Sequence, residues 1–145
     1  MTYCTDVDLL NYRPNILSLG VSSWETQRND AFDYINRIII ARWYNQAAVK
    51  MGYDPNLHYF DPTLVKDDCL KRLECYKTLQ FAYVLLMNES PEKGGFERNI
   101  KTFGEFFGDE LDSVLANGVS YDWSGDGSIT SDEALISAPR RLHRS

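Results

Sequence analysis

A twelve-residue segment near the end of the chain carries oxygen-bearing side chains at the spacing of an EF-hand calcium loop. Side-chain oxygens fall at loop positions 1, 3, 5, 9 and 12, and position 7 offers its backbone carbonyl. In loop order these residues are Asp122, Ser124, Asp126, Ser128, Thr130 and Glu133. Gly127 occupies position 6, where the chain must turn sharply. Because Ca²⁺ prefers several oxygen ligands, this spacing predicts a calcium site.

The same segment has a simpler interpretation as a capped turn without metal. Thr130 and Glu133 also match a capping box, and Asp, Ser and Gly are common turn formers. Position 3 is Ser124 rather than Asp, and the chain has no second loop to pair with this one. A calcium ion bound here is therefore expected to have a weak, structural affinity, on the order of 10⁻⁵ to 10⁻³ M.

The composition is that of an ordinary soluble protein with one hydrophobic core. The chain has 145 residues, a net charge of −6, 43% hydrophobic residues and 25% charged residues. Its three cysteines are an odd number, which favours reduced thiols. We expect no signal peptide and no membrane-spanning segment, because no window is apolar for long enough.

Charge is unevenly distributed near the end of the chain. Residues 102–139 contain eight acidic residues and no Lys or Arg. The last seven residues, 139–145, reverse this sign and are predicted to form a basic docking tail. Its expected contacts are Arg140, Arg141, Leu142 and Arg144. The alternatives are a solvated end and a clasp onto the acidic surface of a neighbouring copy, around 109–112.

Capping motifs and apolar periodicity predict an all-α fold. We expect two long antiparallel helices with shorter helices packed on them, followed by the EF-hand-like loop and the extended tail. The predicted helices cover 5–11, 22–50, 61–87 and 96–117. The predicted domains are a helical bundle over 1–118, an acidic loop with a short helix over 119–138, and the docking tail over 139–145.

Particular residues define the expected helix ends and core. Asp61 and Pro62 are expected to begin the third helix as its cap and first residue, and Asn117-Gly118 to end the fourth. The core is expected to contain Ile35, Ile39, Leu73, Tyr76, Leu79 and Phe103. Several further aromatic residues are expected to lie in the core or, alternatively, at an interface: Trp24, Tyr44, Tyr53, Tyr59 and Trp123.

No combination of nucleophile, base and orienting group is evident. The two histidines are His58, in a predicted connection, and His143, in the tail. Acidic pairs such as 67–68 and 109–110 are consecutive, so they divide between helix faces and indicate solvated surface. We therefore expect a protein that is not an enzyme.

The order of these elements resembles the helical head-to-tail adaptor (connector) proteins of tailed bacteriophages. The resemblance lies in the Thr-Asp-Val-Asp-Leu-Leu opening, the Trp24-headed helix, the helix headed by Asp61-Pro62, the helix over 96–115, the Tyr121-Asp122 loop and the Arg-Arg-Leu-His-Arg ending. It implies a virion protein of the neck, made in the host cytoplasm, with no catalytic residues. It also implies a homo-oligomeric ring, commonly a dodecamer, beneath the portal protein. The tail would dock onto the portal, and the opposite side would meet the next neck or tail protein. DNA would only pass through the ring lumen, and no membrane would be involved.

Two other functions remain open on the sequence. A small calcium-binding module, EF-hand-like or dockerin-like, would explain the loop. However, a dockerin would have a second loop, and a sensor would have continuous helices on both sides. A helical regulator that binds nucleic acid is supported only by the arginines of the tail.

Overall fold

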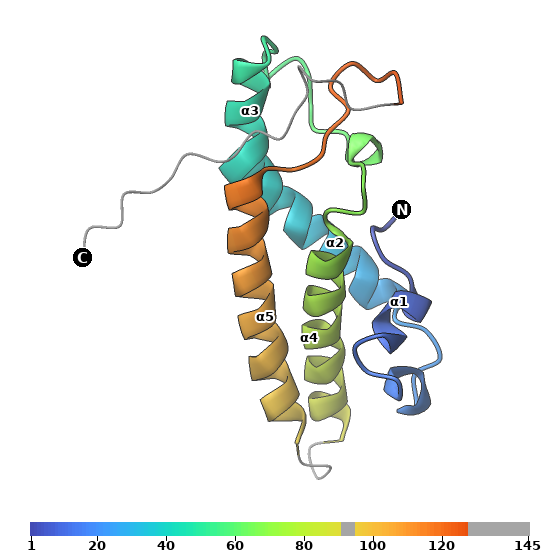
Figure 1. The fold of residues 1–145 in the computed structure, drawn as a ribbon. Coiled ribbons are helices and arrows are strands. Elements are labelled where there is room, and N and C mark those ends of the chain that lie inside the picture. The colour runs from blue at the N-terminus through green and yellow to red at the C-terminus, as the bar shows by residue number, and fades with distance from the viewer. Residues whose placement is uncertain (91–94, 128–145) are drawn as a thin grey trace, which may run out of the picture. The chain divides into compact units, whose positions relative to one another are not determined.

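A computed structural model describes residues 1–90 and 95–127 (Figure 1). The structure is 63% helix, with no strand among the described residues, so the predicted all-α class is confirmed. The α-helices are α1 (Asp6–Leu10), α2 (Glu25–Ile39), α3 (Asn45–Lys50), α4 (Lys71–Glu89) and α5 (Phe96–Asn117). Two short 3₁₀ helices, η1 (Ile16–Ser18) and η3 (Pro62–Leu64), and one π-helix, η2 (Ile40–Tyr44), complete the elements.

The chain divides into two compact units. Unit 1 contains residues 1–35 and 71–111, and unit 2 contains residues 36–70 together with those from 112 onward. Helices α2 and α5 each contribute to both units. The predicted boundaries at 118–119 and 138–139 stay a prediction.

Unit 1 packs the N-terminal segment against α4 and α5. Thr5 caps α1 in the capping box that its sequence predicts, with Asp8 as the reciprocal partner. Trp24 is fully buried, and its indole Nε1 donates a 3.0 Å hydrogen bond to the carbonyl oxygen of Ile16. The buried cluster around it includes Leu9, Ile16, Cys75, Leu79, Ala82 and Phe103.

The predicted helix over 22–50 is continuous but contains a π-helical segment. It begins at Glu25, and the amide of Trp24 just before it donates a 3.1 Å hydrogen bond to the Asp6 carboxylate. In η2 the amide of Asn45 reaches back to the carbonyl of Ile40, which adds one residue to that turn. Trp43 and its neighbour Tyr44, both in η2, are buried.

The prediction that the third helix begins at Asp61 is wrong in its extent. Asp61 does act as a cap, since its Oδ1 accepts the Thr63 amide at 2.9 Å, but it caps only the short helix η3. Val65 then turns extended, and α4 begins at Lys71. The acidic pair 67–68, expected on a helix, instead lies in a turn with positive φ angles of 60° and 51°.

Unit 2 joins two distant segments through a short backbone pairing. Val65 and Tyr121 form an antiparallel bridge. The amide of Lys66 donates to the carbonyl of Ser120 at 2.8 Å, and the amide of Asp122 donates to the carbonyl of Leu64 at 2.9 Å. This pairing fixes where the predicted calcium loop starts.

The expected core residues are nearly all buried. Ile35, Ile39, Leu73, Leu79 and Phe103 are at most 1% exposed, whereas Tyr76 is half-buried. The end of α5 is also as predicted: Gly118 has φ +85° and donates its amide to the Val114 carbonyl at 2.8 Å.

Candidate functional site

The first half of the predicted calcium loop is folded around the carboxylate of Asp122. Its Oδ1 accepts hydrogen bonds from the hydroxyl of Ser124 at 3.2 Å and the amide of Gly125 at 3.1 Å. Its Oδ2 accepts the amide of Gly127 at 2.7 Å. Gly127 has φ +90°, the left-handed conformation that the sharp turn at position 6 requires. The carboxylate at position 1 therefore holds the turn closed.

Only part of the predicted ligand set can be placed. Asp122 is 1% exposed, while Ser124 and Asp126 are exposed beside it. The other predicted ligands, Ser128, Thr130 and Glu133, lie outside the described residues. Within 1–90 and 95–127, no three His, Cys, Asp or Glu side chains are grouped as metal ligands. A carboxylate has about four lone-pair positions, so Asp122 can hold these hydrogen bonds and also ligate a cation.

An aromatic cluster surrounds the start of this loop. It consists of Trp43, Tyr44, Tyr53, Phe60, Tyr121 and Trp123. The Trp123 ring stacks against Tyr44 at 5.4 Å and against Tyr53 at 5.8 Å, each with an interplanar angle of 14°. The Tyr121 hydroxyl accepts the amide of Asp61 at 2.9 Å. These contacts couple the loop to the connection that follows α3.

The tyrosines of this cluster are structural groups. Burial raises the pKa of Tyr121 and that of Tyr44, so neither phenol ionises readily.

The expectation that the aromatic residues are core holds for Trp24, Tyr44 and Trp123, which are at most 9% exposed. Tyr59 is 79% exposed, so the core alternative is wrong for it and the interface alternative stays a prediction.

A buried polar group that the sequence did not indicate lies in unit 1. The backbone amide of Cys4 donates to Oε2 of Glu74, and Oε1 of Glu74 is buried without a hydrogen-bond partner. Burial raises the pKa of the Glu74 carboxyl. A hydrogen bond to Cys75, together with burial, raises the pKa of the Cys4 thiol far above its usual range. The Cys4 thiol thus stays protonated and is a poor nucleophile.

Lys77 on α4 is a second buried charge in unit 1. Its ammonium lies 4.2 Å from the Phe107 ring centre, 4.6 Å from that of Tyr34 and 5.6 Å from that of Phe81. It donates to Gln80 Oε1 at 2.7 Å. Burial lowers the pKa of this ammonium. Lys77 is the third basic residue of α4 after Lys71 and Arg72, and nothing in that sequence indicated that it would lie among aromatic rings.

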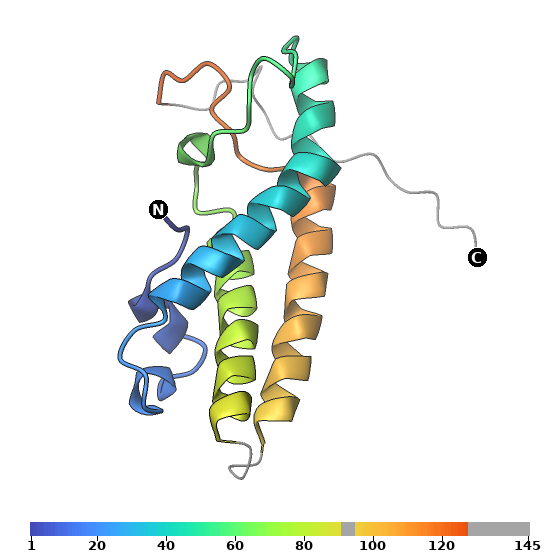
Figure 2. The ribbon, with the colours of Figure 1, turned by 180° about the vertical axis from the view of Figure 1, so that it is seen from behind.

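A shallow groove of about 510 Å³ lies beside Gln80, between α4 and α5. Its apolar lining comes from Met87, Ile100 and Gly104, and its charged lining from Glu97, Lys101 and Glu105. Figure 2 shows α2 crossing this helix pair, with the ends of α4 and α5 near residue 90 extending past the crossing. We call this surface the α4–α5 groove.

The predicted docking residues of the tail cannot be placed. Arg140, Arg141, Leu142 and Arg144 lie outside the described residues. The acidic surface proposed for a clasp lies on α5, where Glu110 pairs with Arg72 at 3.9 Å. None of the described helices is long and apolar enough to cross a bilayer.

Comparison with known proteins finds no match: no family model fits the sequence, and no curated protein or solved structure is significantly similar to it.

Proposed function

We propose that the chain is a structural virion protein, a head-to-tail connector subunit that forms a ring beneath the portal of a tailed bacteriophage. Its partners are the portal protein, neighbouring copies and the next neck or tail protein, and DNA only passes through the ring lumen. The proposal rests on the order of sequence elements from the Thr5-headed helix to the arginine-rich end. The all-α fold supports the proposal. We also propose that the long helices of the subunit are antiparallel.

The distribution of apolar and reactive side chains is the observation that favours this function. Two side chains of unit 1 with reactive groups, Cys4 and Glu74, are at most 1% exposed. The backbone amide of Cys4 donates a hydrogen bond to the Glu74 carboxylate. In contrast, Leu57 and Tyr59 are 75% and 79% exposed, and Phe106 is 45% exposed. Large exposed apolar side chains suit a protein that works by binding other chains.

Electron microscopy of the purified protein, alone and mixed with a cognate portal, tests the proposal. We expect rings with the portal bound on one side. A chain that stays monomeric and does not bind the portal would exclude the connector function.

Removal of the basic tail tests how the portal is bound. Deleting residues 140–145 should abolish portal binding and leave the helical circular dichroism spectrum unchanged, because the arginines supply forked hydrogen bonds to carboxylates. The matched control is Arg98→Ala, which removes an exposed arginine of α5 and should leave portal binding intact. Loss of the ring instead of portal binding would identify the tail as a clasp between copies.

A small calcium-binding module is the second candidate, and the closed turn at Asp122 favours it. Its carboxylate, held by the amides of Gly125 and Gly127, occupies position 1 of the loop sequence. We propose that Ca²⁺ binds weakly through Asp122, Ser124, Asp126, Ser128, Thr130 and Glu133. Such a site is compatible with either function.

Trp123 provides the readout for calcium, since it lies inside the predicted loop and its ring stacks against Tyr44 and Tyr53. Millimolar Ca²⁺ should change the tryptophan fluorescence of the wild type and leave that of Glu133→Ala unchanged. It should also raise the melting temperature, because a ligand that binds only the native state stabilises it. Equal melting temperatures with calcium and with chelator would exclude the site. A calcium-dependent monomer would favour the module over the connector.

A further inference from the structure

The turn after α3 presents two large apolar side chains to solvent. Leu57 and Tyr59 are 75% and 79% exposed, on either side of His58. Isolated exposed apolar residues are common on protein surfaces, so exposure alone indicates little. What distinguishes this pair is that the backbone carrying it is held firmly in place. We call residues 54–59 the knob.

Four hydrogen bonds fix the knob. The carbonyl of Asp54 accepts the amides of Leu57 at 3.0 Å and His58 at 2.8 Å, and its carboxylate accepts the amide of Asn56 at 2.9 Å. The hydroxyl of Tyr44 donates to the carbonyl oxygen of His58. The His58 ring also lies edge-on to Tyr53 at 5.1 Å. A surface ordered in this way loses little conformational entropy when it binds a partner.

We infer that the knob of one copy inserts into the α4–α5 groove of a neighbouring copy. The groove supplies the matching chemistry: Met87 and Ile100 offer apolar surface to Leu57 and Tyr59. Gly104 lies against the side-chain amide of Gln80, which forms a polar part of the groove lining. The occupant in this inference is a second copy of this chain, and the inference rests on the proposed function because that function requires a ring.

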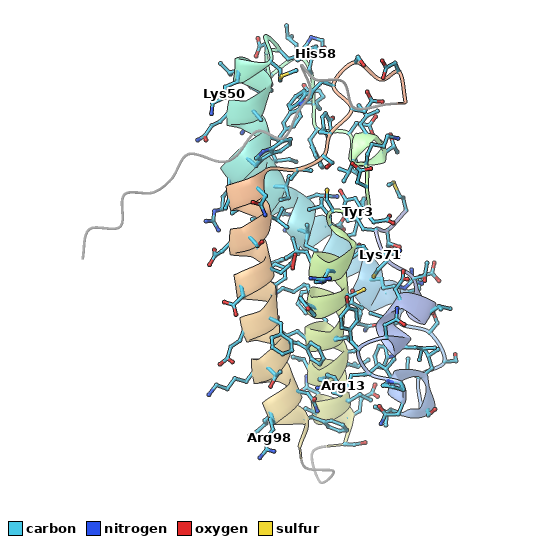
Figure 3. All side chains as sticks on the ribbon, viewed as in Figure 1. Tyr3, Arg13, Lys50, His58, Lys71 and Arg98 are labelled. Carbon is cyan, nitrogen blue, oxygen red and sulfur yellow. The ribbon has the colours of Figure 1, made fainter. Side chains whose placement is uncertain are left out.

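Charge complementarity supports a second copy as the occupant. Lys50 ends α3 at the same end of unit 2 as His58 (Figure 3), and Asp54 begins the knob. The groove offers a side chain of opposite charge to both Lys50 and Asp54, because Lys101 lies between Glu97 and Glu105 along one row of α5. Lys50 can thus pair with a glutamate, and Asp54 with Lys101.

The two surfaces are different, so the contact can repeat head-to-tail from one copy to the next, as the proposed ring requires. A head-to-tail contact between identical chains produces a closed ring or an open filament, and not a two-fold dimer. This is the kind of contact that a ring-forming subunit needs. The inference therefore assigns particular residues to the subunit interface of the proposed ring.

Photo-crosslinking between labelled and unlabelled copies tests the contact. A photoreactive phenylalanine replaces Tyr59 in isotopically heavy protein, which is mixed with light wild-type protein, alone and with portal. We expect heavy–light crosslinks to peptides containing residues 80–87 or 97–105. The matched control has the photoreactive residue at Val7 of α1, which is 69% exposed, and should give no such crosslink. Crosslinks elsewhere, or none between copies in either mixture, would overturn the inference.

Charge reversal provides an independent measurement. Lys50→Glu, and Glu97→Lys with Glu105→Lys, should each weaken self-association about 2- to 5-fold per ion pair in analytical ultracentrifugation. Combining them should restore the wild-type affinity, because the pairs re-form with reversed sign. Additive weakening in the combined variant would count against the contact.

These outcomes separate the inference from the proposed function. Portal-bound rings whose crosslinks lie outside the groove would remove the inference and leave the connector function. Crosslinks at the groove without portal binding would support the inference and count against the connector function.

Discussion

Gly104 on α5 lies directly against the side-chain amide of Gln80 on α4. A Cβ atom on Gly104 would be 2.7 Å from Gln80 Nε2, which is closer than non-bonded atoms approach. The same Gln80 accepts a 2.7 Å hydrogen bond from the Lys77 ammonium through Oε1. The absence of a side chain at position 104 thus helps to position the acceptor for a buried charge.

This relationship predicts different effects for the two glycines of α5. Gly108→Ala should raise the free energy of unfolding by about 0.5–1 kcal/mol, because nothing lies near its Cβ position and alanine favours the helix. Gly104→Ala should gain less, since Gln80 must move away and its bond to Lys77 weakens. Urea denaturation of the two variants measures the difference. Equal gains would show that Gln80 does not depend on the space at Gly104.

The backbone conformation at Asp67 predicts that glycine is tolerated there and that a β-branched residue is not. Asp67 has φ +60°, a left-handed conformation that aspartate tolerates and β-branched residues do not. Asp67→Val should lower the free energy of unfolding by about 1–2 kcal/mol, whereas Asp67→Gly should stay within about 0.5 kcal/mol of the wild type. Both are measured by chemical denaturation. A valine variant as stable as the wild type would contradict the left-handed turn.

Glu74 predicts a stability that falls as the pH rises. Burial raises the pKa of its carboxyl above the ordinary value of 4.5, against the opposing effect of the hydrogen bonds from Cys4. A raised carboxyl pKa favours the protonated form in the folded state. Its contribution is therefore fully present below pH 4.5 and is lost as the pH rises through the folded-state pKa.

The comparison that isolates this effect uses Glu74→Gln, which cannot ionise. Relative to that variant, the wild type should lose free energy of unfolding between acid pH and about pH 8, measured by thermal or urea denaturation. The control is Glu105→Gln, which removes an exposed carboxyl of α5 and leaves Glu74 in place. A constant difference between wild type and Glu74→Gln at all pH values would contradict a buried, titrating carboxyl.

Asp122 predicts a structural effect that is independent of metal. Asp122→Asn replaces one acceptor oxygen with a donor, so the amide of Gly125 or Gly127 loses its partner. In the presence of chelator it should lower the free energy of unfolding by about 1–2 kcal/mol. Asp126→Asn, at an exposed position of the same loop, should cost less. Equal small losses would mean that the turn does not depend on the buried carboxylate.

The sequence by itself determined the local features of this protein. The Thr5 capping box, the end of α5 at Gly118 and the position-6 turn at Gly127 depend on the preferences of adjacent residues. The burial of Ile35, Ile39 and Leu79 followed from helical periodicity, because apolar spacing alone identifies the inner face of a helix.

Tertiary structure decided what depends on contacts between distant residues. The segment at Asp61 has a helix cap and a helix-compatible proline, yet its helix ends at Leu64, where pairing of Leu64 and Lys66 with residues 120–122 begins. A turn with positive φ angles follows at 67–68, and α4 begins only at Lys71. The burial of Glu74 against the Cys4 backbone depends on a chain separation of 70 residues, which no local pattern encodes. The exposure of Tyr59 likewise depends on which aromatic rings fill the cluster around Trp123, because only packing decides which of several similar residues is left outside.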